Sequence, residues 1–365
     1  MSDSVRGYPL RAFVICLIAY TTAQMDLALF GYAVPAIRAE FGLTLSEVMA
    51  IVSSAFLLGG ALLVVLGWLA DRVGRLPLFQ FSLLGSSLLV ALISIAPGVA
   101  TLTALRGASI AVGGLSYPIT GAIITEEMPA RVRGLFMGLL QIGYPLGWAL
   151  ASLWSMWLLT EYGWRQLFWV GLVSLPMVWV VRSYLREPPR SVAARSTEAP
   201  PRFSDLFASG IRERAITLFI AQFLFVWAYA ASIFLFPSFL REVRSLDAFN
   251  FSLLIGAGNA IGVLGYVLAA WIGERVWTRR NTVVFWTLLG ALLFQVLVWV
   301  PTTFGQILFV YALMSMFFYG SAAVKFAYLA EVFPTRIRAL AMACCGSLAV
   351  TMGSAAGPYT VSLAI

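Results

Sequence analysis

Long apolar stretches alternate with short polar ones along almost the whole chain. A helix that crosses a bilayer needs roughly 20 predominantly apolar residues. By that measure the pattern predicts eleven spanning helices, at about 12–34, 47–69, 78–97, 100–124, 136–159, 166–186, 213–238, 250–272, 282–302, 304–330 and 338–361. The pattern therefore indicates an all-α protein that crosses a membrane many times.

One polar stretch, from about Arg186 to Arg212, is much longer than the others. It is rich in proline and arginine, as expected of a linker between two groups of packed helices. We therefore expect a six-helix N-terminal bundle at 1–190, a cytoplasmic linker at 191–212 and a C-terminal bundle at 213–365. The C-terminal bundle would hold five spans, with its last span missing.

The composition agrees with this pattern and excludes several protein classes. Hydrophobic residues make up 61% of the chain and charged residues 11%, whereas soluble proteins average about 45–50% and about 25%. An ordinary soluble enzyme, a disordered chain and a disulfide scaffold are therefore excluded. The chain has no histidine, so any proton coupling falls to carboxylates, and we expect no metal site and no other cofactor.

The basic residues predict the orientation in the membrane. Cytoplasmic loops carry an excess of arginine and lysine. With the N-terminus placed in the cytoplasm, 18 basic residues lie on that side of the membrane and 4 lie on the other. The net charge of +8 is therefore explained by topology rather than by binding to nucleic acid. We expect a monomeric, multi-pass protein of the cell (inner or plasma) membrane, surrounded by lipid.

A segment at the end of the fourth predicted span recurs at the end of the tenth. Glu126-Glu127-Met128-Pro129-Ala130-Arg131-Val132-Arg133 is matched by Glu331-Val332-Phe333-Pro334-Thr335-Arg336-Ile337-Arg338 at a constant offset of 205 residues. Both copies fall on the predicted cytoplasmic side, so the repeat is parallel. Parallel repeats indicate two bundles related by an axis along the membrane normal, with a site between them that opens to each side in turn.

The loop between the second and third spans carries another motif. Gly67, Asp71, Gly74 and Arg75 give the pattern G-x-x-x-D-x-x-G-R. The matching junction in the second half has Glu274-Arg275 followed by Arg279-Arg280, but it lacks the glycines. Glycines let helices approach closely, and the aspartate can accept hydrogen bonds from the N-terminus of a neighbouring helix.

This loop, the repeated segments Glu126–Arg133 and Glu331–Arg338 (the closures) and the two-bundle layout together resemble the major facilitator superfamily across essentially the whole chain. The resemblance implies two pseudo-symmetric helix bundles, usually with twelve spans, and a transporter rather than an enzyme. It also implies that the loop and the closures form a latch at the cytoplasmic gate. We therefore expect gating roles for Gly67, Asp71, Gly74, Arg75, Glu126, Arg131, Arg133, Glu331, Arg336 and Arg338.

Three charged residues fall inside predicted spans, where charge is costly and therefore indicates function. Asp26 lies in span one, Arg106 in span four and Lys325 in span ten; by the family resemblance, all three spans line the central cavity. We expect Asp26 to carry a proton and to pair with Arg106, while Arg106 and Lys325 attract a carboxylate. The alternatives are structural roles. Asp26 would be a hydrogen-bond partner, Arg106 a brace between helix ends, and Lys325 a lysine whose side chain reaches the membrane surface.

Other polar and aromatic residues could line the same cavity. The candidates are Gln24, Gln141, Tyr144, Gln222, Asn259, Trp148, Trp227 and Tyr229. Of these, we expect Gln141, Tyr144, Gln222 and Asn259 to bind substrate. Asn259 lies in Gly258-Asn259-Ala260-Ile261-Gly262, a spacing of small residues that favours close helix packing. The sequence has no G-x-x-x-x-G-K loop for ATP, so transport would use a gradient or be passive.

The segment from Met25 to Ile37 resembles span one of the aromatic acid and metabolite proton symporters. That branch often carries D-G-x-D; the second aspartate falls on Asp26, whereas the first falls on Ala23 and the glycine on Gln24. The leading hypothesis is therefore proton-coupled symport of a small organic anion, such as a carboxylate or aromatic acid. The alternatives are proton-coupled efflux of a drug or metabolite, and a membrane sensor that does not transport.

Overall fold

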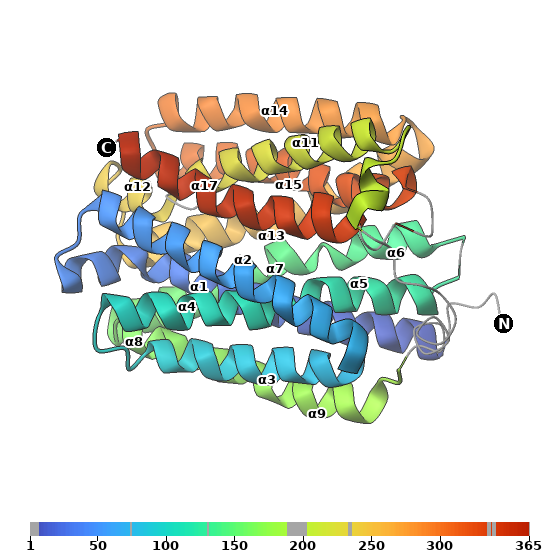
Figure 1. Ribbon diagram of the computed structural model, residues 1–365. Helices are drawn as coiled ribbons and strands as arrows, with labels where there is room; N and C mark the ends of the chain where they lie inside the picture. The colour runs from blue at the N-terminus through green and yellow to red at the C-terminus, as the bar shows by residue number, and fades with distance from the viewer. Residues whose placement is uncertain are drawn as a thin grey trace. The chain divides into compact units, whose positions relative to one another are not determined.

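The structure is a computed structural model that describes residues 7–73, 75–129, 131–187, 203–232, 236–333, 337 and 341–364. These residues form helices joined by short turns, and no strand occurs among them (Figure 1). The helices are α1 (Tyr8–Phe41), α2 (Leu45–Val73), α3 (Arg75–Ile93), α4 (Val99–Gly114), α5 (Ser116–Glu127), α6 (Arg133–Leu140), α7 (Gly143–Glu161), α8 (Trp164–Leu167), η1 (Phe168–Ser174), α9 (Leu175–Tyr184), η2 (Phe203–Phe207), α11 (Arg212–Ser232), α12 (Phe236–Glu242), α13 (Ala248–Arg275), α14 (Arg279–Trp299), α15 (Phe304–Val332), η3 (Met342–Leu348) and α17 (Ala349–Ala364).

The predicted all-α membrane architecture is confirmed. Within the described residues, 10 helical stretches are long and apolar enough to cross a membrane, and they coincide with the first ten predicted spans. Spans four and five are each built from two consecutive helices, α4 with α5 and α6 with α7. The eleventh predicted span, 338–361, falls largely on η3 and α17, and its first three residues lie outside the described part.

Polar residues at the helix starts satisfy the amides that a helix leaves without partners. Before α2, Thr44 and Glu47 form a reciprocal capping box: the Glu47 carboxylate accepts from the Thr44 amide at 2.8 Å, and the Thr44 hydroxyl accepts from the Glu47 amide at 3.2 Å. Asp247 caps α13 by accepting from the amide of Asn250 at 2.8 Å. These caps keep backbone amides satisfied where the chain turns back into the apolar stretch.

The helices fall into two compact units. The first comprises Met1–Tyr32, Thr120–Leu167 and Leu240–Tyr328. In it, α7 packs along α13, and α13 in turn contacts α14 and α6. Trp286 of α14 packs against Phe317 of α15, with ring centroids 5.0 Å apart. This unit therefore combines helices from both halves of the chain.

The second unit comprises Ala33–Ile119, Phe168–Phe239 and Leu329–Ile365. Here α2 packs against α4 and α17, α3 packs against α4 and η1, and α11 packs against α17. The hydroxyl of Ser53 on α2 donates to the carbonyl of Ala355 on α17 at 2.7 Å. This unit too draws on both halves of the chain, and the predicted division into bundles at 1–190 and 213–365 stays a prediction.

Two glycines on α7 bring that helix into backbone contact with α1. A methyl group at Gly147 would lie 2.6 Å from the carbonyl oxygen of Thr21 and 2.7 Å from the amide nitrogen of Met25. One turn earlier, a methyl group at Gly143 would lie 2.6 Å from the ring of Tyr20. Since backbone atoms cannot rotate out of the way, only glycine at position 147 permits this approach.

We expect Gly147→Ala to lower the free energy of unfolding by about 1–3 kcal/mol, the usual cost of overpacking a close contact. Thermal unfolding of the purified protein in detergent measures the change. The matched control is Gly305→Ala, because no described atom lies within 4 Å of a methyl group at that position. An equal unfolding temperature for both variants would contradict the proposed contact.

Candidate functional site

A cluster of buried aromatic rings lies in the first unit, built from α1, α7 and α15. The hydroxyl of Tyr32 donates to the carbonyl of Trp148 at 3.3 Å, and their ring centroids are 6.1 Å apart. The Tyr144 ring lies 6.1 Å from that of Trp148 and 6.0 Å from that of Tyr319. The hydroxyl of Tyr311 lies beside the side chain of Tyr319. Five rings therefore form one continuous cluster across three helices.

Residue spacing explains how these rings come together. Tyr144 and Trp148 are four residues apart on α7, so they project from the same side of the helix, each next to a glycine that contacts α1. Tyr311 and Tyr319 are eight residues apart on α15, which also places them on one face. The close contact between α1 and α7 thus holds the ring of Trp148 beside Tyr32.

Asn259 of α13 joins this cluster through Tyr311. It is fully buried, and its Nδ2 donates to the carbonyl of Ile255 at 2.8 Å and to the hydroxyl of Tyr311 at 3.3 Å. The ring of Tyr311 packs directly on Gly258, and a methyl group at Gly262 would lie 3.2 Å from Tyr319. The predicted packing role of the two glycines is confirmed: they let α15 lie close to α13.

The cluster holds a buried donor and a buried acceptor that have no hydrogen-bond partner among the described residues. They are the indole Nε1 of Trp148, a side chain 4% exposed, and Oδ1 of Asn259. An unsatisfied buried polar group costs about 1–3 kcal/mol. A donor and an acceptor of this kind are typical of a binding site, where a ligand supplies the missing bonds.

The three charged residues predicted inside spans all lie on helices, two of them in the first unit and one in the second. Asp26 of α1 is 3% exposed and belongs to the first unit, as does Lys325 of α15, which is half-buried. Arg106 of α4 is 2% exposed and belongs to the second unit. The pairing of Asp26 with Arg106 therefore stays a prediction, whereas the burial of both side chains agrees with their place inside spans.

The other predicted substrate residues are divided between the units in the same way. Gln141 is buried at the C-terminal end of α6 in the first unit, which also holds Tyr144 and Asn259. Gln222 is half-buried on α11 in the second unit. The first unit thus brings together Asp26, Gln141, Tyr144, Asn259 and Lys325. Of these, Tyr144 is part of the ring cluster and Asn259 donates to it.

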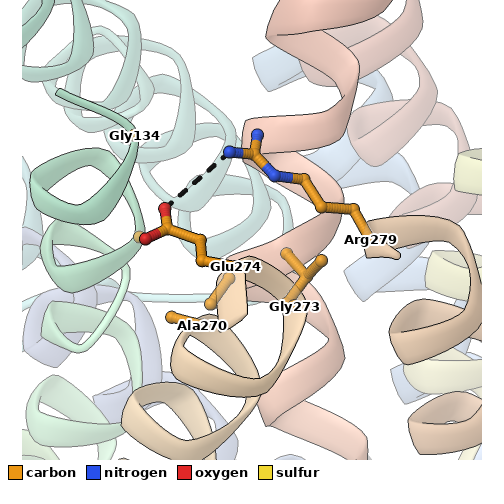
Figure 2. Close-up of a pocket in the computed structure, with 8 residues that line it drawn as sticks. Gly134, Ala270, Gly273, Glu274 and Arg279 are labelled. Atoms are coloured by element: carbon orange, nitrogen blue, oxygen red, sulfur yellow. Dashed lines mark ion pairs between the residues drawn. The ribbon is translucent and has the colours of Figure 1, made fainter. Parts of the chain in front are cut away.

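A second feature of the first unit is an ion pair at the beginning of α6. The Glu274 carboxylate lies 3.7 Å from the Arg279 guanidinium, and Figure 2 shows both side chains beside Gly134. A methyl group at Gly134 would lie 3.5 Å from both charged groups. A carboxylate is favoured at a helix N-terminus, where the unpaired amides carry partial positive charge. Both residues of the pair line a small pocket, together with residues of α6, α13 and α15.

Some of the predicted gating residues can be placed. Arg133 is the first residue of α6 and donates from Nη2 to the carbonyl of Met128 at 3.4 Å. Glu126 lies in the last turn of α5, and Arg131 is exposed. Gly74, Arg336 and Arg338 lie outside the described residues; Gly67, Asp71 and Glu331 fall on helices, but their surroundings are also outside the described part.

The structure contains several contacts that the sequence does not reveal. Glu187, which the sequence places in the polar stretch after span six, accepts from the amides of Arg75 and Leu76 at 2.8 and 3.0 Å, and so caps α3. The tyrosines of α15 were not singled out, although their helical spacing with Ser315 was a usable signal. No cluster of three metal-ligating side chains occurs in the part of the chain that the structure describes.

Comparison with known proteins supplies the family. The profile of the Major Facilitator Superfamily matches residues 16–358. The cis,cis-muconate transport protein of Acinetobacter baylyi is 27% identical over 96% of this chain and 86% of its own length. The gentisate transporter of Corynebacterium glutamicum is 25% identical over 87% of this chain and 72% of its own.

A solved structure confirms the fold independently. The crystal structure of a D-xylose–proton symporter superposes with a TM-score of 0.75, covering 98% of this chain and 90% of the symporter at 17% identity. The family and these relatives are transporters, which agrees with the prediction that the chain is not an enzyme. Because the family profile spans nearly the whole chain, this multi-pass membrane protein belongs to the Major Facilitator Superfamily of transporters.

Proposed function

We propose that this transporter carries a small organic anion together with a proton, by alternating access across the cell membrane, with its N-terminus in the cytoplasm. The names of its relatives specify cis,cis-muconate and gentisate, both organic acids. The observation that carries the proposal is Asp26, a carboxyl group only 3% exposed within the apolar helix α1. Its burial is what a proton-carrying group in a transporter requires.

Asp26 supports proton coupling because of what burial does to a carboxyl group. An ionised carboxylate is costly in an apolar surrounding unless a cation or hydrogen bonds compensate it. A proton removes the charge outright. We infer that Asp26 alternates between a protonated form and a form paired with a cation such as Arg106. Since the chain has no histidine, this carboxyl group takes the role that an imidazole could otherwise play.

Arg106 and Lys325 support recognition of an anion. Arg106 is 2% exposed within α4, and its planar guanidinium can bind a carboxylate through two parallel hydrogen bonds. Lys325 provides a second positive charge on α15, the helix that carries Tyr311 and Tyr319. Two cations against one carboxyl group leave the site able to accept a negative charge. Gln141, Tyr144, Gln222 and Asn259 complete the proposed substrate site.

The Glu274–Arg279 ion pair is also part of the proposed cytoplasmic gate. It lies at the junction that matches the Gly67–Arg75 loop in the repeat, and its carboxylate lies beside the N-terminus of α6. We infer that this contact forms when the gate is closed and breaks when it opens. The same role is proposed for Asp71 and its loop, and for the repeated closures that end with Arg133 and Arg338.

We expect Asp26→Asn to abolish uptake of an organic acid against its gradient, because asparagine cannot take up and release a proton. Exchange of substrate between the two sides persists, since it needs no net proton movement. Proton entry into proteoliposomes, measured with a series of aromatic and aliphatic carboxylates, tests both parts. Glu40→Gln is the control, because Glu40 is exposed near the end of the same helix. Unimpaired accumulation by Asp26→Asn would refute the coupling role.

The same assay separates symport from the efflux alternative. Substrate-dependent proton entry with a carboxylate supports symport. If carboxylates gave no response but lipophilic cations drove proton flux, the protein would be an efflux antiporter instead.

We expect Arg106→Gln to raise the KM for the carboxylate about 10- to 100-fold, the range for losing a hydrogen bond to a charged group. Saturation curves for uptake in proteoliposomes give the value. Arg212→Gln, at an exposed position at the start of α11, is the control and leaves KM unchanged. A KM in Arg106→Gln equal to that of the unmodified protein would mean that Arg106 braces helices rather than binding substrate.

We expect Glu274→Gln to shift the gate toward its open state about 2- to 10-fold, because a half-exposed ion pair and a helix terminus each contribute up to about 1 kcal/mol. The readout is the rate at which an impermeant maleimide labels Ala323→Cys, a buried position lining the pocket, after the three native cysteines are replaced by alanine. Glu161→Gln, exposed at the end of α7, leaves the rate unchanged. Equal labelling in both variants would remove Glu274 from the gate.

A further inference from the structure

The side-chain amide of Asn259 forms hydrogen bonds through its nitrogen, whereas its oxygen has no donor among the described residues. Its nitrogen donates to the carbonyl of Ile255, one turn back on α13, and to the hydroxyl of Tyr311. Because a carbonyl oxygen can only accept hydrogen bonds, the atom that faces Ile255 must be the nitrogen, and the orientation of the amide is fixed. Oδ1 is then the atom left over: it is buried, and no residue in the described part of the chain donates to it.

Trp148 offers the complementary group. Its indole nitrogen can only donate, and it is likewise buried with no acceptor among the described residues. The ring of Tyr144 contacts the rings of both Trp148 and Tyr319. Tyr319 lies beside Tyr311, whose hydroxyl accepts a hydrogen bond from Asn259. One acceptor and one donor therefore belong to the same aromatic cluster in a single unit of the structure.

Resting on the proposed function, we infer that Asn259 is a specificity-determining residue: its amide oxygen accepts a hydrogen bond from a ring hydroxyl of an aromatic acid. The tyrosine and tryptophan rings of the cluster can pack edge-to-face or offset against an aromatic ring of the substrate. The indole N–H of Trp148 donates to an oxygen of the same molecule. An aromatic acid without a hydroxyl leaves the acceptor of Asn259 buried and unpaired, and such a site discriminates against it.

A hydrophobic residue at position 259 would remove both the cost and the preference. Leucine has the same branched skeleton of four side-chain heavy atoms as asparagine, so Asn259→Leu keeps the shape of the side chain beside Tyr311. It deletes the acceptor oxygen and, with it, the amide donor to Tyr311. Asn259→Ser is smaller and keeps an acceptor oxygen, so it should retain part of the preference. Both predictions concern the ratio between two substrates, in which the fraction of correctly folded protein cancels.

The test uses the full chain in proteoliposomes with an inward proton gradient, and radiolabelled benzoate, 3-hydroxybenzoate and 4-hydroxybenzoate as probes. We expect the unmodified protein to prefer at least one hydroxybenzoate over benzoate by about tenfold in Vmax/KM, the scale set by one buried hydrogen bond. Asn259→Leu should bring that ratio to about one to two, by slowing uptake of the hydroxylated acid. Asn250→Leu, in the first turn of the same helix, should keep the full preference.

The possible failures are distinguishable. Equal uptake of benzoate and both hydroxybenzoates by the unmodified protein overturns the inference and leaves proton-coupled anion transport standing. An equal loss for all probes in Asn259→Leu also overturns it, because a purely structural asparagine would give that result. If none of the three acids is taken up, both the inference and the proposed function for aromatic acids fail.

Discussion

Hydrocarbon offers no hydrogen bonds, so every backbone amide within the bilayer must find its partner inside the chain. That constraint leaves helices as the solution for this chain, and it leaves side chains as the means of joining them. Helices in lipid gain little from burying apolar surface and associate through close packing instead. Gly147 and Gly258 permit that packing here, and the rings of the aromatic cluster lie beside the helix contacts that these glycines allow.

The same constraint makes polar side chains expensive, which is why the few that are buried carry meaning. Asn259 and Trp148 each leave one polar atom without a partner among the described residues. Asp26 and Arg106 are almost completely covered. None of these groups is needed to build an apolar helix bundle, and each costs stability. In the proposed function these groups bind the substrate or the proton, which gives them a role other than stabilising the fold.

A transporter must also break contacts during each cycle, so its gate has to be weak. The Glu274–Arg279 pair suits that requirement, because its side chains are 36% and 22% exposed and its charged atoms are 3.7 Å apart. Water competes for both groups, and the pair contributes little net free energy. A modest difference between two states is enough to shift their populations when substrate or proton binds.

The sequence by itself determined the helical membrane architecture, the position of each described span and the family, because apolar length is a local property that any window of the chain reveals. It also located Asp26, Arg106 and Lys325, since a charge in an apolar run stands out without any structure. Only the tertiary structure decided that Tyr32, Trp148, Tyr144, Tyr319, Tyr311 and Asn259 form one cluster, and that Glu187 caps α3. Those contacts join residues far apart in the sequence, and their geometry depends on how closely the helix backbones approach, which no local pattern specifies.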